Sequence, residues 1–204
     1  MRKITITFLI IALSLFVVGL TACNNDGKRE AEDPQAYSYT GDTEIEVGDR
    51  SFILEDQPES KAEEAVVMDF LYTITGEFDK KLEVIADIEP HRMSIEAEKK
   101  HMEEDVYIKS YVIHSIATLS EEQYIDQNSA DGSYNPLFYN NLQNLLNEYD
   151  LEDYEIVNID FTWTHSAQAL AWVPQWGDGT YNRSFFVGKE STSDNYKIYD
   201  YGMM

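Results

Sequence analysis

Two histidines lie on predicted strands at positions that would turn their imidazole rings toward a shared interior. His165 follows Phe161 and Trp163 at every second position, so it should lie on the inward face of its strand. His114 stands in the same relation to Val112 on another long strand. An imidazole inside a pocket suits general base catalysis, because burial and neighbouring charge readily tune its pKa.

Aromatic residues would complete such a pocket. Tyrosine is abundant, with 14 copies, and its phenol can donate to a ligand while its ring packs. The alternative is an ordinary core, in which an inward histidine is hydrogen-bonded and strand tyrosines serve packing. Spacing alone brings no pair within hydrogen-bond reach, so no catalytic residue is assigned. The candidate pocket residues are His165, His114, Tyr111, Trp163 and Tyr199.

The sequence predicts neither a metal site nor a cofactor. Residues 126–132 begin like a calcium loop, but Ala130 replaces a ligand and Leu137 stands where the bidentate glutamate is needed. His91 and His101 lack the spacing of a helical zinc pair. A glycine-rich phosphate loop is also missing from the sequence.

The N-terminal segment predicts where the protein resides. Arg2 and Lys3 precede an apolar stretch up to Leu20, and the chain then reads Leu-Thr-Ala-Cys, ending at Cys23. This pattern is typical of a secretory signal, and its last four residues resemble the lipobox of bacterial lipoproteins. The resemblance implies a signal peptide over residues 1–22. It also implies a diacylglyceryl group on the Cys23 thiol, with acyl chains such as palmitate, and anchorage on the extracytoplasmic face of the cell membrane. A retained membrane-spanning helix is the alternative.

Charge and composition exclude several classes of function. Lys and Arg number 15 against 38 Asp and Glu, which gives a net charge of −23. Such an acidic chain is unsuited to nucleic acid, because phosphate binding depends on Lys and Arg. It is equally unsuited to electrostatic docking on an anionic membrane. With 43% hydrophobic residues it still has enough apolar surface for a core.

The mature chain divides into a tether and a folded domain. Residues 23–59 are polar and acidic and predict a tether that starts at the lipidated cysteine, with a small hairpin over 44–54. The folded domain is expected over 60–204. Its predicted helices are a capped one from Ser60 to Gly76, a short one ended by Pro90, one over 94–104, and one after Pro136. Its predicted strands are 106–119, 155–165, 181–189 and 196–201, and the even-numbered residues of 106–119 are expected inward. Residues 169–172 either extend the strand 155–165 or start its partner.

Helices followed by strands, with one helix inserted, predict an α+β fold in which N-terminal helices pack on a curved antiparallel sheet. This order resembles the cone-shaped nuclear-transport-factor-2-like fold. The segments Gln-Trp-Gly-Asp-Gly-Thr-Tyr (175–181), Val-Gly-Lys (187–189) and Lys-Ile-Tyr-Asp-Tyr-Gly (197–202) are similar to uncharacterised Gram-positive lipoproteins of that fold. Isomerases and dehydratases of the fold use an Asp or His base inside the cone. The lipoprotein family itself has no assigned function, so the resemblance implies fold and location only.

Three hypotheses follow. The first is a lipid-anchored domain that binds a small molecule in the cone or an envelope protein partner. The second is a pocket enzyme of isomerase or dehydratase type with His165 or His114 as base, and the third is a structural module that forms homodimers. An exposed row of Trp163, Trp172 and Trp176 would favour a protein interface. A deep cavity lined by Tyr and His would favour a ligand.

Overall fold

The computed structural model describes residues 37–127, 136–149, 151–172 and 174–203. The chain divides into two compact units, Met1–Gln35 and Ala36–Met204, and all described residues belong to the second. The predicted signal peptide, Cys23 and most of the calcium-like loop therefore lie outside the described residues.

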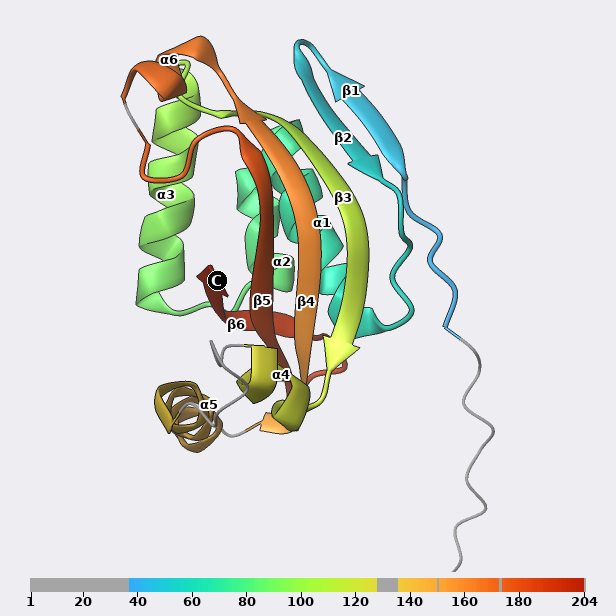
Figure 1. The fold of residues 1–204 in the computed structure, drawn as a ribbon. Helices are drawn as coiled ribbons and strands as arrows, with labels where there is room; N and C mark the ends of the chain where they lie inside the picture. The colour runs from blue at the N-terminus through green and yellow to red at the C-terminus, as the bar shows by residue number, and fades with distance from the viewer. Residues whose placement is uncertain (1–36, 128–135, 150, 173, 204) are drawn as a thin grey trace, which may run out of the picture. The chain divides into compact units, whose positions relative to one another are not determined.

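The second unit is an α+β fold built on one open six-stranded sheet in the order β1-β2-β3-β4-β5-β6 (Figure 1). The strands are β1 (Glu44–Val47), β2 (Arg50–Leu54), β3 (Ile108–Leu119), β4 (Leu151–His165), β5 (Gly179–Glu190) and β6 (Lys197–Met203). The sheet is mixed, because β2 runs parallel to β3 while the other neighbours are antiparallel. The expectation of a purely antiparallel sheet is wrong at that pair. The helical segment between β2 and β3 supplies the crossover that parallel pairing needs.

The predicted hairpin is present and belongs to the sheet. β1 and β2 pair in register, and Phe52 on β2 is fully buried in the main core. Residues of the expected tether thus contribute to the folded unit, because burial of an aromatic ring favours keeping this strand on the sheet. The folded unit therefore begins before Ser60, which marks only the start of a helix.

Helix α1 (Lys61–Thr75) forms as its sequence predicts. Ser60 is the N-cap, and its Oγ accepts a hydrogen bond from the Glu63 backbone nitrogen. Gly76 ends the helix with a φ of 77°, a left-handed conformation that glycine adopts without strain. The buried stripe of α1, which includes Phe70 and Ile74, packs across the inner face of the sheet.

The next helices differ from prediction in their boundaries. A short η1 (Phe78–Lys80) and α2 (Lys81–Val84) replace the single short helix. Pro90 does not end a helix but lies in the first turn of α3 (Glu89–Glu103), where its missing N–H costs nothing. Residues 167–171 form α6 (Ala167–Ala171) rather than a strand, because Ser166 caps a helix there by accepting from the Ala169 backbone nitrogen.

Strand β3 departs from simple alternation. Its pairing with β4 contains two register shifts, between Ile108 and Ser110 and between Ile113 and Ser115. Each irregularity exchanges the faces of the strand. Tyr111 and Ile113 are therefore buried, where the even-numbered residues were expected inward. On β4, by contrast, the predicted inward row is confirmed, since Val157, Ile159, Phe161 and Trp163 are all buried.

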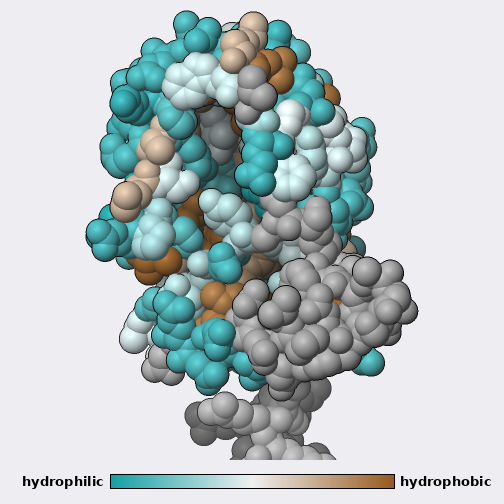
Figure 2. All heavy atoms as spheres, turned by 60° about the vertical axis from the view of Figure 1, so that its left-hand side comes forward, coloured by the Kyte–Doolittle hydropathy of each residue, from teal (hydrophilic) through white to brown (hydrophobic). Residues whose placement is uncertain are grey.

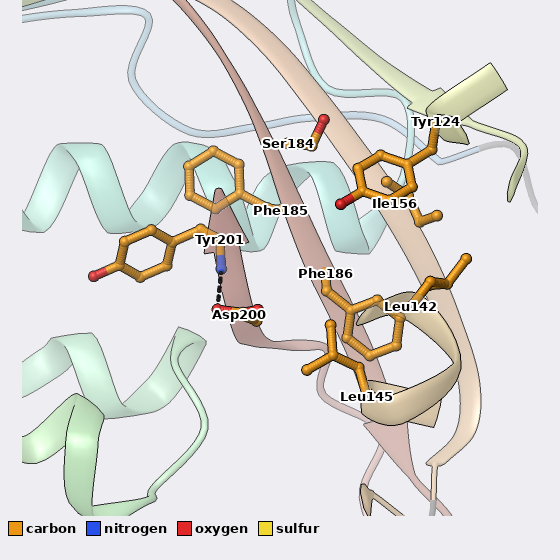
Figure 3. A pocket seen from close by; sticks show the side chains of 9 residues that line it. All are labelled: Tyr124, Leu142, Leu145, Ile156, Ser184, Phe185, Phe186, Asp200 and Tyr201. Atoms are coloured by element: carbon orange, nitrogen blue, oxygen red, sulfur yellow. Dashed lines mark hydrogen bonds between the residues drawn. The ribbon is translucent and has the colours of Figure 1, made fainter. Parts of the chain in front are cut away.

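A second, smaller core lies on the other face of the sheet. Helix α4 (Glu121–Gln127), which was not predicted, and α5 (Pro136–Glu148) lie near one end of the strands (Figure 1). Figure 3 shows Phe186 and Leu142 on one side of β5, while Phe185 points to the other side. Neighbouring residues of β5 thus serve two separate cores.

Candidate functional site

A pocket with a volume of about 500 Å³ opens between the inner face of the sheet, α3 and α6. Pockets that bind small organic molecules span roughly 300–1,000 Å³. Figure 2 shows the molecular surface hollowed in the upper half of this side. The wall contributed by the sheet includes Tyr111, Trp163 and Arg183, and the wall contributed by helices includes Phe70 and Lys81.

Three of the five candidate pocket residues line this pocket. Tyr111 and Trp163 are buried in its wall, and His165 lies at its edge at the end of β4. Burial raises the pKa of Tyr111, so this phenol stays protonated and has a proton to donate. The pocket is therefore lined by tyrosine and histidine, which was expected to favour a ligand.

His114 and Tyr199 lie elsewhere, and their assignment to the pocket is wrong. The register shift between Ile108 and Ser110 places His114 on the outer face, where Nδ1 lies 2.7 Å from Glu55 Oε2 and Nε2 lies 2.7 Å from Thr162 Oγ1. Tyr199 lies in the smaller core and donates a 2.9 Å hydrogen bond to Glu190. The β5–β6 pairing contains a register shift between Phe186 and Val187, and Tyr199 lies at this irregularity on β6.

His165 is held by an aspartate from the loop before β5. Its Nδ1 lies 2.8 Å from Asp178 Oδ1, and the same oxygen accepts a 2.8 Å hydrogen bond from the His165 backbone nitrogen. The His165 side chain is only 7% exposed, against 42% for Asp178, so the ring is less hydrated than its place at a strand end suggests. The hydrogen bond from His165 lowers the pKa of Asp178, which keeps this carboxylate ionised.

The backbone of the same loop fixes two aromatic walls. The Gly177 carbonyl accepts a 2.7 Å hydrogen bond from Trp163 Nε1 and a 2.8 Å one from the Tyr181 hydroxyl. Gly177 and Asp178 belong to the segment 175–181. This segment therefore orients three side chains at or beside the pocket.

A buried cation lies in the helical wall. Lys81 is 3% exposed, and its Nζ lies 3.0 Å from Asp69 Oδ1, 2.6 Å from Glu98 Oε2 and 2.9 Å from Thr73 Oγ1. Burial alone would lower the pKa of Lys81, but the two carboxylates outweigh it and the pKa is raised. Removal from water and the charge of Asp69 raise the pKa of Glu98 despite Lys81. The charge of Lys81 is thus compensated by the two carboxylates.

Arg183 lies on the inner face of β5, and aromatic rings surround its guanidinium. Its Cζ lies 5.3 Å from the ring centroid of Tyr201 and 5.7 Å from those of Phe161 and Trp163. The fourth ring, Phe185, is 5.9 Å away. These distances are within the range of cation–π attraction.

Sequence reasoning missed both basic residues of the pocket. A signal for Arg183 existed, because it alternates with Tyr181 and Phe185 on a strand that was predicted correctly. Lys81 gave no such signal. Its partners Asp69 and Glu98 lie on two other helices, and only the tertiary fold brings the three together.

A smaller gap lies on the opposite side of β5, against the second core. Figure 3 shows Tyr124, Leu145 and Ile156 around it, with Asp200 and Tyr201 at its edge. Its volume is about 30 Å³, enough for about one water molecule. This gap is a packing defect rather than a ligand site.

Comparison with known proteins gives no assignment. No family model, curated protein or solved structure matches this chain. Within the described residues, three or more His, Cys, Asp or Glu side chains nowhere gather in an arrangement that would hold a metal ion. Among the helices that the structure describes, none has the length and apolar character needed to cross a bilayer.

Proposed function

We propose that this protein is a lipid-anchored extracytoplasmic domain that binds a small molecule in the pocket between α3, α6 and the sheet. The observation that carries the proposal is the pocket itself, about 500 Å³ in volume, with aromatic walls and a few oriented polar groups. The anchor is argued from the lipobox-like sequence before Cys23 and from the basic and apolar residues that precede it. Two acyl chains would hold the domain stably at the cell membrane.

The finer fold assignment belongs to the same proposal. The order of helices and strands and the packing of α1 across the inner face of the sheet support a cone-shaped, nuclear-transport-factor-2-like domain. The parallel pairing of β2 with β3 at one edge is a departure from the antiparallel sheet expected of it.

The exposed tryptophans do not favour the dimer module over a ligand. Trp163 is 8% exposed and belongs to the pocket wall, while Trp172 and Trp176 are 52% and 39% exposed. The three side chains therefore form no continuous exposed row. Trp172 lines the same pocket, which places its exposed ring at the entrance to a ligand site.

Binding can be tested with the neutral dye phenylnaphthylamine, which fluoresces when it leaves water. We expect saturable binding of one dye per chain to the full protein. Val106→Trp, which adds an indole to the pocket wall, should weaken binding about tenfold or more. Ala117→Trp places the same ring on the exposed outer face and should leave affinity unchanged. Absence of binding, or equal effects of the two variants, would refute the pocket as a ligand site.

A second candidate function, a pocket enzyme, is favoured by the pairing of His165 with Asp178. A carboxylate on Nδ1 favours, for the neutral imidazole, the tautomer with a free Nε2, which is the atom that accepts a proton from a substrate. Proton abstraction of the isomerase or dehydratase type would use that base, with the Tyr111 phenol as a donor in the same pocket. Long-range nitrogen–proton NMR tests whether the neutral His165 ring has a free Nε2. A neutral His165 protonated on Nε2 would exclude this mechanism.

A further inference from the structure

Arg183 places a positive charge against the deep apolar wall of the pocket. Phe161 and Phe185, two of the rings around it, are at most 1% exposed, and Tyr201 on its other side is 40% exposed. The guanidinium therefore lies between two buried rings and one partly exposed ring. Its N–H donors lie in the plane of the group.

The two basic side chains of the pocket differ in what they can offer a ligand. Asp69 and Glu98 both lie within 3.0 Å of Lys81 Nζ, so the Lys81 charge is already compensated. A guanidinium has more N–H donors than any other side chain, and a carboxylate, sulfonate or phosphate engages two of them side by side. Because a guanidinium has five N–H donors, a contact made by some of them leaves others that can face a ligand oxyanion.

The aromatic walls exclude a cationic ligand and favour a flat apolar one. An aromatic box often binds an organic cation, but here Arg183 already occupies the faces of four rings. A second positive charge beside it would be repelled. Tyr111 and Trp163 provide further ring surface, and their centroids are 6.2 Å apart. Ring surface of this kind packs against planar or hydrocarbon groups.

We propose that the pocket takes an organic anion, with its acidic group against Arg183 and its apolar body between the aromatic walls. This inference rests on the proposed function, because it names the ligand class of the same pocket. The acidic character of the chain makes a preference for anions a stricter test of this inference. A net charge of −23 repels anions in general, so preference for an anion requires a local cation.

The test compares two dyes with one skeleton. Anilinonaphthalene sulfonate carries an acidic group that phenylnaphthylamine lacks, and both are titrated into the full wild-type protein. We expect the sulfonate to bind at least as tightly as the neutral dye, and each dye to displace the other. Salt should weaken the sulfonate only, because screening acts on charge.

Variants assign the effect to one side chain. Arg183→Gln should weaken the sulfonate by about tenfold or more and the neutral dye by less than about threefold. Lys189→Gln removes a charge from the same strand outside the pocket and should change neither. Equal weakening of both dyes by Arg183→Gln would overturn the proposal while leaving the pocket intact.

The wild-type titrations stand even if Arg183→Gln fails to fold. A sulfonate that binds more than about tenfold more weakly than the neutral dye overturns the anion preference. Binding of neither dye, by contrast, overturns the proposed function itself. The two failures are therefore distinguishable.

Discussion

Asp178 Oδ1 accepts hydrogen bonds from both the backbone nitrogen and the ring Nδ1 of His165, each at 2.8 Å. One carboxylate oxygen thus fixes the end of β4 and the orientation of the imidazole in the pocket wall. Because the bond uses Nδ1, the ring presents Nε2 as its remaining polar atom. Whether the pocket binds or catalyses, the polarity of its edge depends on this contact.

The pairing predicts an acid-dependent loss of stability. His165 lowers the pKa of Asp178 below its ordinary value of 3.8, so the ionised form stabilises the fold at higher pH. This stabilisation should be lost as the pH falls below 3.8 and through the lowered pKa. Asp178 is 42% exposed, so we expect a contribution of under about 1 kcal/mol.

Urea denaturation of Asp178→Asn at several pH values measures this effect. The variant should be less stable than wild type above about pH 4, and the difference should shrink toward pH 2. Asp194→Asn, an exposed acid on the β5–β6 turn, serves as the matched control. A difference that grows on acidification would contradict the expected sign.

The inward row of β4 predicts that substitutions at two neighbouring residues, Phe161 and Thr162, differ strongly in their effect on stability. Phe161 is fully buried, and its ring contacts Phe70 at a centroid distance of 5.3 Å. Phe161→Ala should therefore cost about 3–5 kcal/mol of unfolding free energy. Thr162 faces the other side, and Thr162→Ala should cost about 1 kcal/mol through its hydrogen bonds to His114 and Thr180. Chemical denaturation decides it, and equal losses would mean that the faces of β4 are misassigned.

Regular periodicity made parts of this fold predictable from sequence. The cap residues Ser60 and Gly76 bounded α1 correctly, and strict alternation identified the buried row from Val157 to Trp163. In both cases one local pattern, helical or extended, continues without interruption. His165 was accordingly placed in the pocket wall from parity alone.

Irregular strand pairing made the positions of other candidate residues unpredictable from the sequence. The shift in β3 between Ile108 and Ser110 turned His114 outward, and another shift between Phe186 and Val187 affected Tyr199. A bulge is set by how two strands pair, so one strand's sequence does not reveal it. The cluster around Lys81 depends likewise on helices that only the tertiary fold brings together.

Anchorage gives a prediction about Cys23, which lies outside the described residues. If the thiol carries a diacylglyceryl group, Cys23→Ser should abolish acylation and cleavage before residue 23, because serine supplies no thiolate to alkylate. Metabolic labelling with an acyl chain, followed by electrophoresis, reads out both changes. An acyl-labelled product of the Cys23→Ser variant at the mature size would refute lipidation at this residue.

The cluster in the helical wall gives the last prediction. Lys81→Met leaves Asp69 and Glu98 without the cation that lies within 3.0 Å of both, and should cost about 3–5 kcal/mol. Because loss of Lys81 favours protonation of these acids in the folded state, the cost should be largest at neutral pH and smaller near pH 4. Adding Asp69→Asn to Lys81→Met should recover part of the loss. Urea denaturation at both pH values measures it, and a cost independent of pH would show that Lys81 contributes packing rather than charge.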